Sequence, residues 1–150
     1  MENKLFESIL VEAAIETVYN DICSIEEILF KYSGSGKIKE SIIDIQALKT
    51  SFSDHINSIK ENIEIIKSGK LQDDAIEKSN KRLIYLAGKC YTNNQYYHAM
   101  YKNGDTDEEL DNLWKQLLNT MIDFNEAVKS DSRIYDMDKA LQIYNGLINN

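Results

Sequence analysis

The sequence predicts an all-α fold: an elongated antiparallel up-down bundle of four long helices, with a shorter fifth helix at the C-terminal end. Apolar residues recur every three or four positions along almost the whole chain, which is the spacing of one helix face. No stretch between turn signals alternates apolar and polar residues as a half-buried strand does. The breaks between periodic segments span about four residues, so consecutive helices are expected to run antiparallel within one domain, residues 1–150.

The first helix is expected from about Asn3 to Tyr32, before a break rich in glycine and serine at residues 32–36. Its core stripe is predicted to consist of Val11, Ile15, Val18, Ile22, Ile25 and Leu29. Six further residues widen its apolar surface beyond one face: Leu5, Phe6, Ile9, Leu10, Ala13 and Ala14. A homodimer through this helix is therefore the favoured expectation, and coverage by the fifth helix is the alternative.

The second helix is expected from about Lys37 to Ser68. Gly69 is predicted to cap its C-terminus, because glycine adopts a positive φ without a Cβ clash. The core side of this helix is predicted to consist of Ile38, Ile42, Ile45, Phe52, Ile56, Ile59, Ile63 and Ile66. The third helix is expected from the aspartates at 73 and 74 to about Lys102, opened by a capping box with Glu77.

The fourth helix is expected to begin at Thr106, with Glu109 completing a second capping box and Gly104 capping the helix before it. Its core side is predicted to consist of Leu110, Leu113, Trp114, Leu117, Met121, Phe124 and Val128. A short break at residues 130–132 precedes the fifth helix. The apolar residues of that helix are Ile134, Met137, Leu141, Tyr144 and Ile148.

The chain has 150 residues and a net charge of −8. This balance argues against a general nucleic-acid binder and against an anionic membrane surface, since both need a positive footprint. No apolar run approaches the roughly 18 residues of a membrane-spanning helix. Glu7, Glu12 and Glu16 interrupt the N-terminal segment, so no signal peptide is expected and a cytoplasmic location is predicted. Cys23 and Cys90 are expected to be buried free thiols there.

Patterns for catalysis and metal binding are weak, so no catalytic residue, metal ligand or cofactor is predicted. His55 lies at the edge of an apolar stripe and is expected to be a partly buried histidine with a hydrogen-bond partner. Glu61, Glu64, Glu77 and Asn80 form a pattern similar to the one with which helical nucleotide pyrophosphohydrolases hold Mg²⁺. Asn80 stands where that pattern has aspartate, and solvated surface carboxylates explain the same residues more simply.

The expected third helix differs from the rest of the chain in charge. Between Ile76 and Gly104 it has five bases, one acid and five of the nine tyrosines. We use the term basic band for five side chains predicted to lie roughly opposite the core: Lys78, Arg82, Tyr85, Lys89 and Tyr96. The core side is expected to consist of Ile76, Leu83, Ala87, Cys90, Asn94, Tyr97 and Tyr101.

Tyrosine and arginine are enriched where proteins bind other proteins, so the basic band is interpreted as a partner-binding surface. A nucleotide-like ligand is the alternative. The simplest explanation is a solvated face on which lysine stems cover the tyrosine rings.

The acidic, single-domain composition predicts a non-catalytic, stoichiometric binding protein that occupies a partner protein's surface. Inhibitors, immunity proteins, antitoxins and phage-encoded anti-defence proteins have this profile. The first alternative is a protein that binds or sequesters a nucleotide-like ligand, with Asn80, Asn94 and tyrosine hydroxyls lining the cavity. A Mg²⁺-dependent nucleotide pyrophosphohydrolase and a structural subunit of a larger assembly are further alternatives.

Overall fold

The structure is a computed structural model that describes residues 2–33, 45–99 and 107–129. Within these ranges the chain forms four helices and no strand: α1 (Glu2–Ser33), α2 (Ile45–Ser68), α3 (Asp73–Ala99) and α4 (Glu108–Lys129). The prediction of an all-α helical fold is confirmed. The predicted fifth helix and the first turns expected of the second helix lie outside the described residues. None of the four described helices combines the length and apolar character needed to cross a membrane.

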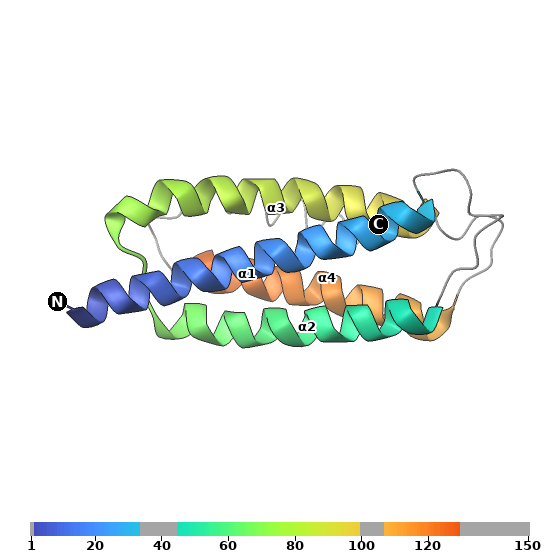
Figure 1. Cartoon of the computed structure of the whole chain (residues 1–150), viewed down its shortest axis with the longest axis horizontal. Coiled ribbons are helices and arrows are strands. Elements are labelled where there is room, and N and C mark those ends of the chain that lie inside the picture. The colour runs from blue at the N-terminus through green and yellow to red at the C-terminus, as the bar shows by residue number, and fades with distance from the viewer. Residues whose placement is uncertain (1, 34–44, 100–106, 130–150) are drawn as a thin grey trace.

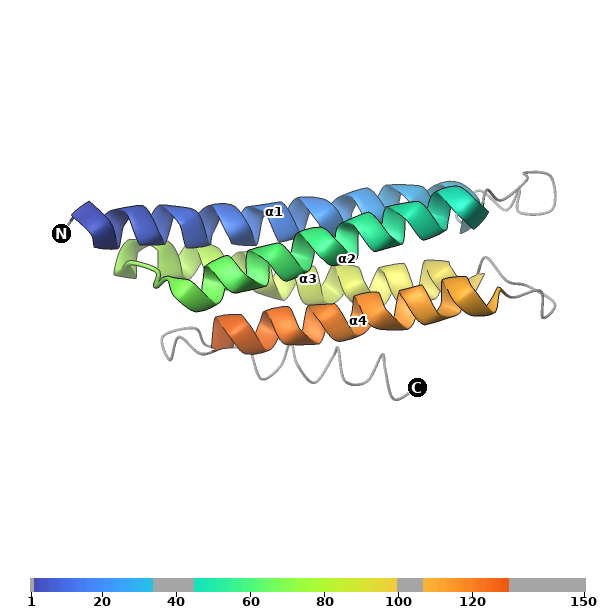
Figure 2. The same cartoon turned by 90° about the horizontal axis from the view of Figure 1, so that it is seen from below.

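The four helices lie lengthwise beside one another in an elongated bundle (Figure 1). α1 and α3 run in one direction and α2 and α4 run in the other, so direction alternates along the chain (Figure 2). The most extensive packing joins α1 to α2, α1 to α3 and α2 to α4. α1 therefore lies between α2 and α3, and its outer side faces the viewer in Figure 1 with no described helix over it.

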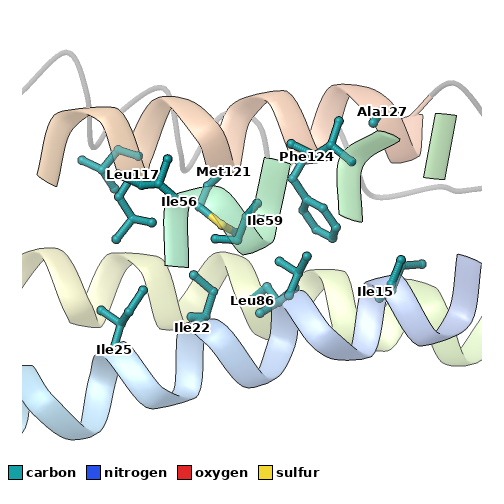
Figure 3. Packing of buried hydrophobic residues seen from close by; sticks show 14 of the residues in the cluster. Ile15, Ile22, Ile25, Ile56, Ile59, Leu86, Leu117, Met121, Phe124 and Ala127 are labelled. Carbon is teal, nitrogen blue, oxygen red and sulfur yellow. The ribbon is translucent and has the colours of Figure 1, made fainter. Parts of the chain in front are cut away.

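The core is built by the apolar stripes that the sequence predicts. All six residues of the predicted α1 stripe are at most 3% exposed. On α2 and α4, the predicted residues from Phe52 to Ile66 and from Trp114 to Val128 are buried as well, while Ile45 and Leu113 are partly buried. Side chains from all four helices meet in the bundle centre (Figure 3).

Gly69 follows α2 as predicted, but the reason for a glycine there is different. Its φ is not in the left-handed region, so it is not the positive-φ cap that we expected. A Cβ built on Gly69 would lie 2.8 Å from Val11 Cγ2 and 3.3 Å from the carbonyl oxygen of Glu7. The connection between α2 and α3 therefore passes so close to α1 that a side chain has no room.

The N-terminus of α4 also differs from the prediction by one residue. Asp107, not Thr106, caps the helix: its Oδ1 accepts the backbone N–H of Leu110 at 2.9 Å. This hydrogen bond is the largest effect that lowers the pKa of Asp107, and Lys49 of α2 lowers it further. Glu109 forms an ion pair with Lys49 (3.2 Å) instead of completing a capping box.

Candidate functional site

The basic band lies along the contact between α3 and α1. Arg82 forms a two-point ion pair with Glu16, with Nε 3.2 Å from Oε2 and Nη2 3.3 Å from Oε1. Farther along α3, Lys89 Nζ donates a hydrogen bond of 2.8 Å to Glu26 Oε1. Both glutamates belong to α1, so these bases join two helices of the same chain.

The tyrosines of the band add ring contacts to the same seam. The ring centroids of Tyr85 and Tyr19 are 5.3 Å apart, and those of Tyr96 and Phe30 are 5.7 Å apart. The Arg82 guanidinium carbon lies 4.2 Å from the centroid of the Tyr19 ring, within the range of a cation–π contact. Ion pairs and aromatic pairs thus alternate along the contact between α1 and α3.

Lys89 is held as a cation by its neighbours. The hydrogen bond to Glu26 is the largest effect that raises the pKa of Lys89, and Tyr85 adds to it. Lys89 Nζ also lies 5.1 Å from the centroid of the Tyr85 ring. The pKa of Tyr19 is raised too, first by its hydrogen bond with Tyr85 and then by burial. With both pKa values raised, Lys89 is a cation and Tyr19 a neutral phenol at neutral pH.

The basic band therefore lies outside the core but is only partly open to solvent, because it follows the contact between α3 and α1. Four of its five residues contact α1, and the Arg82 and Lys89 side chains are only 34% and 26% exposed. Among the described residues, Lys78 has no ion-pair partner, and it is exposed. The sequence also suggested that lysine stems cover the tyrosine rings. Lys89 does lie over the Tyr85 ring, but this contact is part of the packing between α3 and α1.

Polar residues are also buried on the inner side of α3. Ser79, Asn80 and Asn93 are buried along with Leu86, so the buried face of α3 includes polar residues beside its apolar ones. Of the expected core residues, Ile76 and Tyr97 are buried and Asn94 is partly buried. The others lie outside what the structure describes: the side chains of Leu83, Ala87 and Cys90, and Tyr101.

Asn94 and Tyr97 were candidates for the lining of a ligand cavity. In the structure, both side chains contact residues of α4. The Tyr97 and Trp114 rings stack at 5.0 Å with an interplanar angle of 16°. Trp114 Nε1 donates a hydrogen bond of 2.8 Å to Asn94 Oδ1, and the Tyr97 hydroxyl donates to the Asp111 carboxylate. Asn80 differs: it is 2% exposed, and its amide has no hydrogen-bond partner among the described residues.

A partly buried polar cluster joins α1 to α2. His55 Nδ1 lies 2.7 Å from Asp21 Oδ1, and Ser58 Oγ donates to Asp21 Oδ2 at 2.7 Å. The His55 side chain is 19% exposed, so it is the partly buried histidine with a partner that the sequence predicts. Sequence reasoning missed Asp21, although its place between the core residues Val18 and Ile22 was a usable signal.

The four residues similar to the pyrophosphohydrolase pattern do not share one site. Glu61 and Glu64 are exposed on α2, Glu77 lies 3.4 Å from Lys81 on α3, and Asn80 points into the core. Among the residues that the structure describes, no group of three or more His, Cys, Asp or Glu side chains is arranged to hold a metal ion.

A hollow of about 570 Å³ opens beside the basic band. It is lined by Tyr19, Asp74, Glu77, Lys78, Lys81, Arg82 and Tyr85. Two carboxylates therefore stand among its three bases, and Glu16 already engages Arg82. Because the lining contains both signs of charge, the hollow attracts an anion only weakly.

A second surface lies at the start of α1 and is strongly apolar. We call it the α1 patch; it consists of Leu5, Phe6, Ile9 and Leu10, which are 51%, 62%, 51% and 42% exposed. The residues occupy two successive turns of the helix, and the first turns of α1 extend beyond the ends of the other described helices (Figures 1 and 2). All four residues are among those predicted to widen the apolar surface of this helix beyond one face.

No protein-family model matches this sequence, and comparisons with curated proteins and with solved structures found no match.

Proposed function

We propose that this protein is a non-catalytic, stoichiometric binding protein that occupies the surface of another protein through the α1 patch. The exposure of the patch carries the proposal, because four large apolar side chains are 42% to 62% exposed on one short stretch of helix. Exposing such a surface to water is unfavourable, and contiguous apolar patches on folded proteins mark interaction sites. Covering the patch with a partner recovers this free energy.

Charge indicates the kind of partner. The chain carries a net charge of −8, and Glu7 lies within the α1 patch without an ion-pair partner among the described residues. A target with an apolar pocket and a basic rim satisfies both features, and opposite charge accelerates association. Inhibitors, immunity proteins, antitoxins and phage-encoded anti-defence proteins are the classes of binding protein that share this acidic, single-domain profile.

The nucleotide-like ligand has less support. Asn94 and Tyr97 are engaged with Trp114 and Asp111, and the hollow beside Arg82 contains carboxylates as well as bases. An anion in this hollow would have to compete with Glu16 for Arg82. A protein that binds the α1 patch would not have to break an ion pair.

The test compares two isoleucines on exposed helix faces. Ile9 of the α1 patch is 51% exposed, and Ile65 of α2 is 37% exposed, so Ile65→Glu is the matched control for Ile9→Glu. Tagged wild type and both variants are used to capture partners from a nuclease-treated lysate of the source cells. A captured protein is then purified, and its affinity and stoichiometry are measured by titration calorimetry. We expect one-to-one binding that Ile9→Glu weakens at least tenfold, or about 1.4 kcal/mol, and Ile65→Glu changes less than twofold.

Three results would contradict the proposal. Equal affinity for the two variants would move the binding surface away from α1. A large loss of thermal stability in Ile9→Glu, absent in Ile65→Glu, would show that the patch is covered within the chain itself. Sedimentation of the free protein tests whether the patch forms a homodimer. If wild type is a dimer and Ile9→Glu is a monomer, a second copy of the chain occupies the patch.

A further inference from the structure

A second, smaller hollow of about 180 Å³ lies between α1 and α3, which run side by side (Figure 1). We call it the small hollow. Its lining includes Glu12, Ile15 and Glu16 of α1 and Lys78, Ser79 and Arg82 of α3. A cavity of about 150 Å³ can hold a benzene molecule, so the small hollow has room for a ligand of about six to eight non-hydrogen atoms.

The small hollow contains a hydroxyl without a partner. Ser79 is 4% exposed, and a polar group at this depth normally has a hydrogen bond. The hydroxyls of Thr17, Thr92 and Thr120 donate to the backbone carbonyl four residues earlier in their helices. Ser79 makes no hydrogen bond within the described part of the chain, and its oxygen is not sealed inside the bundle. The hydroxyl can therefore donate to a ligand in the small hollow or accept from it.

Charges of both signs surround this hydroxyl. Glu16 and Arg82 pair with each other. Glu12 and Lys78 line the same hollow, but neither has an ion-pair partner among the described residues. A simple anion would be attracted by Lys78 and repelled by Glu12, and a simple cation would meet the opposite effects. A molecule that carries both charges can satisfy both groups at once.

We propose that the small hollow binds a small α-amino acid in its zwitterionic form. The ammonium group of the ligand would donate to the Glu12 carboxylate and to the Ser79 hydroxyl, and the ligand carboxylate would accept from Lys78. The pair between Glu16 and Arg82 stays intact, because the ligand brings no net charge to compete for it. Alanine and serine have the size that the hollow accommodates. This inference does not rest on the proposed function, since no residue of the α1 patch lines the small hollow.

The test adds L-alanine to the ¹⁵N-labelled full chain and follows the amide chemical shifts by NMR, which detects weak binding and locates it. Propionate and ethylamine are the comparison ligands, because each lacks one of the two charged groups of alanine. We expect L-alanine to shift the amides of residues 12–16 and 78–82 in a saturable way and to bind at least tenfold more tightly than either comparison ligand. If propionate or ethylamine binds as tightly as L-alanine, the hollow attracts simple ions and the inference is wrong. Shifts only at other residues, or no saturable shift up to the solubility of L-alanine, would also overturn it.

Two pairs of variants assign the contacts. Glu12→Gln removes the unpaired carboxylate with little change of shape, and Glu61→Gln is its control, because Glu61 is exposed on α2 without an ion-pair partner among the described residues. We expect Glu12→Gln to weaken L-alanine at least tenfold, and Glu61→Gln to change its affinity less than twofold.

Ser79→Ala removes only a hydroxyl and should weaken L-alanine at least threefold. Ser68→Ala is the matched control, since Ser68 Oγ donates to the carbonyl oxygen of Ile65 in its own helix at 2.9 Å. The amide spectrum of each variant also shows that it is folded, so a loss of binding is separated from a loss of structure. If Glu12→Gln and Ser79→Ala bind L-alanine as tightly as their controls, the ligand does not occupy the small hollow and the inference is wrong.

Discussion

At Gly69 the chain leaves α2 and passes directly over α1. A Cβ at this position would lie 2.8 Å from Val11 Cγ2, and Val11 is only 3% exposed. Gly88 offers a comparison within the same chain, because a Cβ at that position of α3 meets nothing within 4 Å. The two glycines therefore have opposite structural roles, one allowing a tight contact and the other lowering helix propensity.

We expect Gly69→Ala to destabilise the protein by about 1–3 kcal/mol, since an inserted methyl group in a packed site forces its neighbours to move. Gly88→Ala is the control and should stabilise the protein by about 0.5–1 kcal/mol, because alanine loses less backbone entropy in a helix. Urea unfolding of both variants measures the two changes. Equal effects of the same sign would show that α1 does not approach Gly69 closely.

Among the four described helices, the apolar stripes of α1, α2 and α4 could be predicted from spacing, whereas the polar part of the buried face of α3 could be predicted only in part. In α1, α2 and α4 the buried side chains are mostly apolar, so periodicity marks the core side directly. On α3, Asn80 was predicted to line an internal cavity and is buried, whereas the burial of Ser79 and Asn93 was not predicted, because an apolar pattern does not mark polar residues as core. The basic band was correctly seen as one aligned set of residues, but its neighbour, α1, could not be known from α3 alone.

The N-terminus of α4 provides a prediction that depends on pH. Asp107 has its pKa lowered by the N–H of Leu110 and by Lys49, so its carboxylate contributes stability above its pKa in the unfolded chain, about 4. That contribution is lost as pH falls through the lower pKa of the folded state. We expect Asp107→Ala to have a lower melting temperature than wild type at pH 7. The difference should shrink steadily below a pH of about 4.

Thermal melting by circular dichroism between neutral and acidic pH measures this effect. Asp123→Ala is the control, because Asp123 is exposed near the other end of α4 and has no ion-pair partner among the described residues. A difference between wild type and Asp107→Ala that stays constant across the pH range would contradict the cap assignment.

Across the whole molecule, charge is divided between neighbouring helices. Residues 5–30 of α1 have six acids and no base, while α3 from Lys78 to its end at Ala99 has four bases and no acid. Two of these four bases, Arg82 and Lys89, pair with glutamates of α1, whereas Lys81 pairs with Glu77 of α3 itself. Sequence analysis could predict alternating helix directions, but not that α1 and α3, which are parallel and not consecutive, would be packing neighbours.

Exchanging the charges of one pair tests this arrangement. Glu26 and Lys89 are 24% and 26% exposed, so their pairing is only partly screened by water. We expect Glu26→Lys alone to destabilise the protein by about 1–3 kcal/mol, because it sets two cations together in a partly buried site. Adding Lys89→Glu should restore most of that loss, giving a coupling of about 1–2 kcal/mol in a double-mutant cycle of urea unfolding. The same exchange at Glu64 and Lys67, which are 76% and 58% exposed, should give a coupling below about 0.5 kcal/mol. If the two cycles give equal couplings, charge does not determine which face of α3 lies on α1.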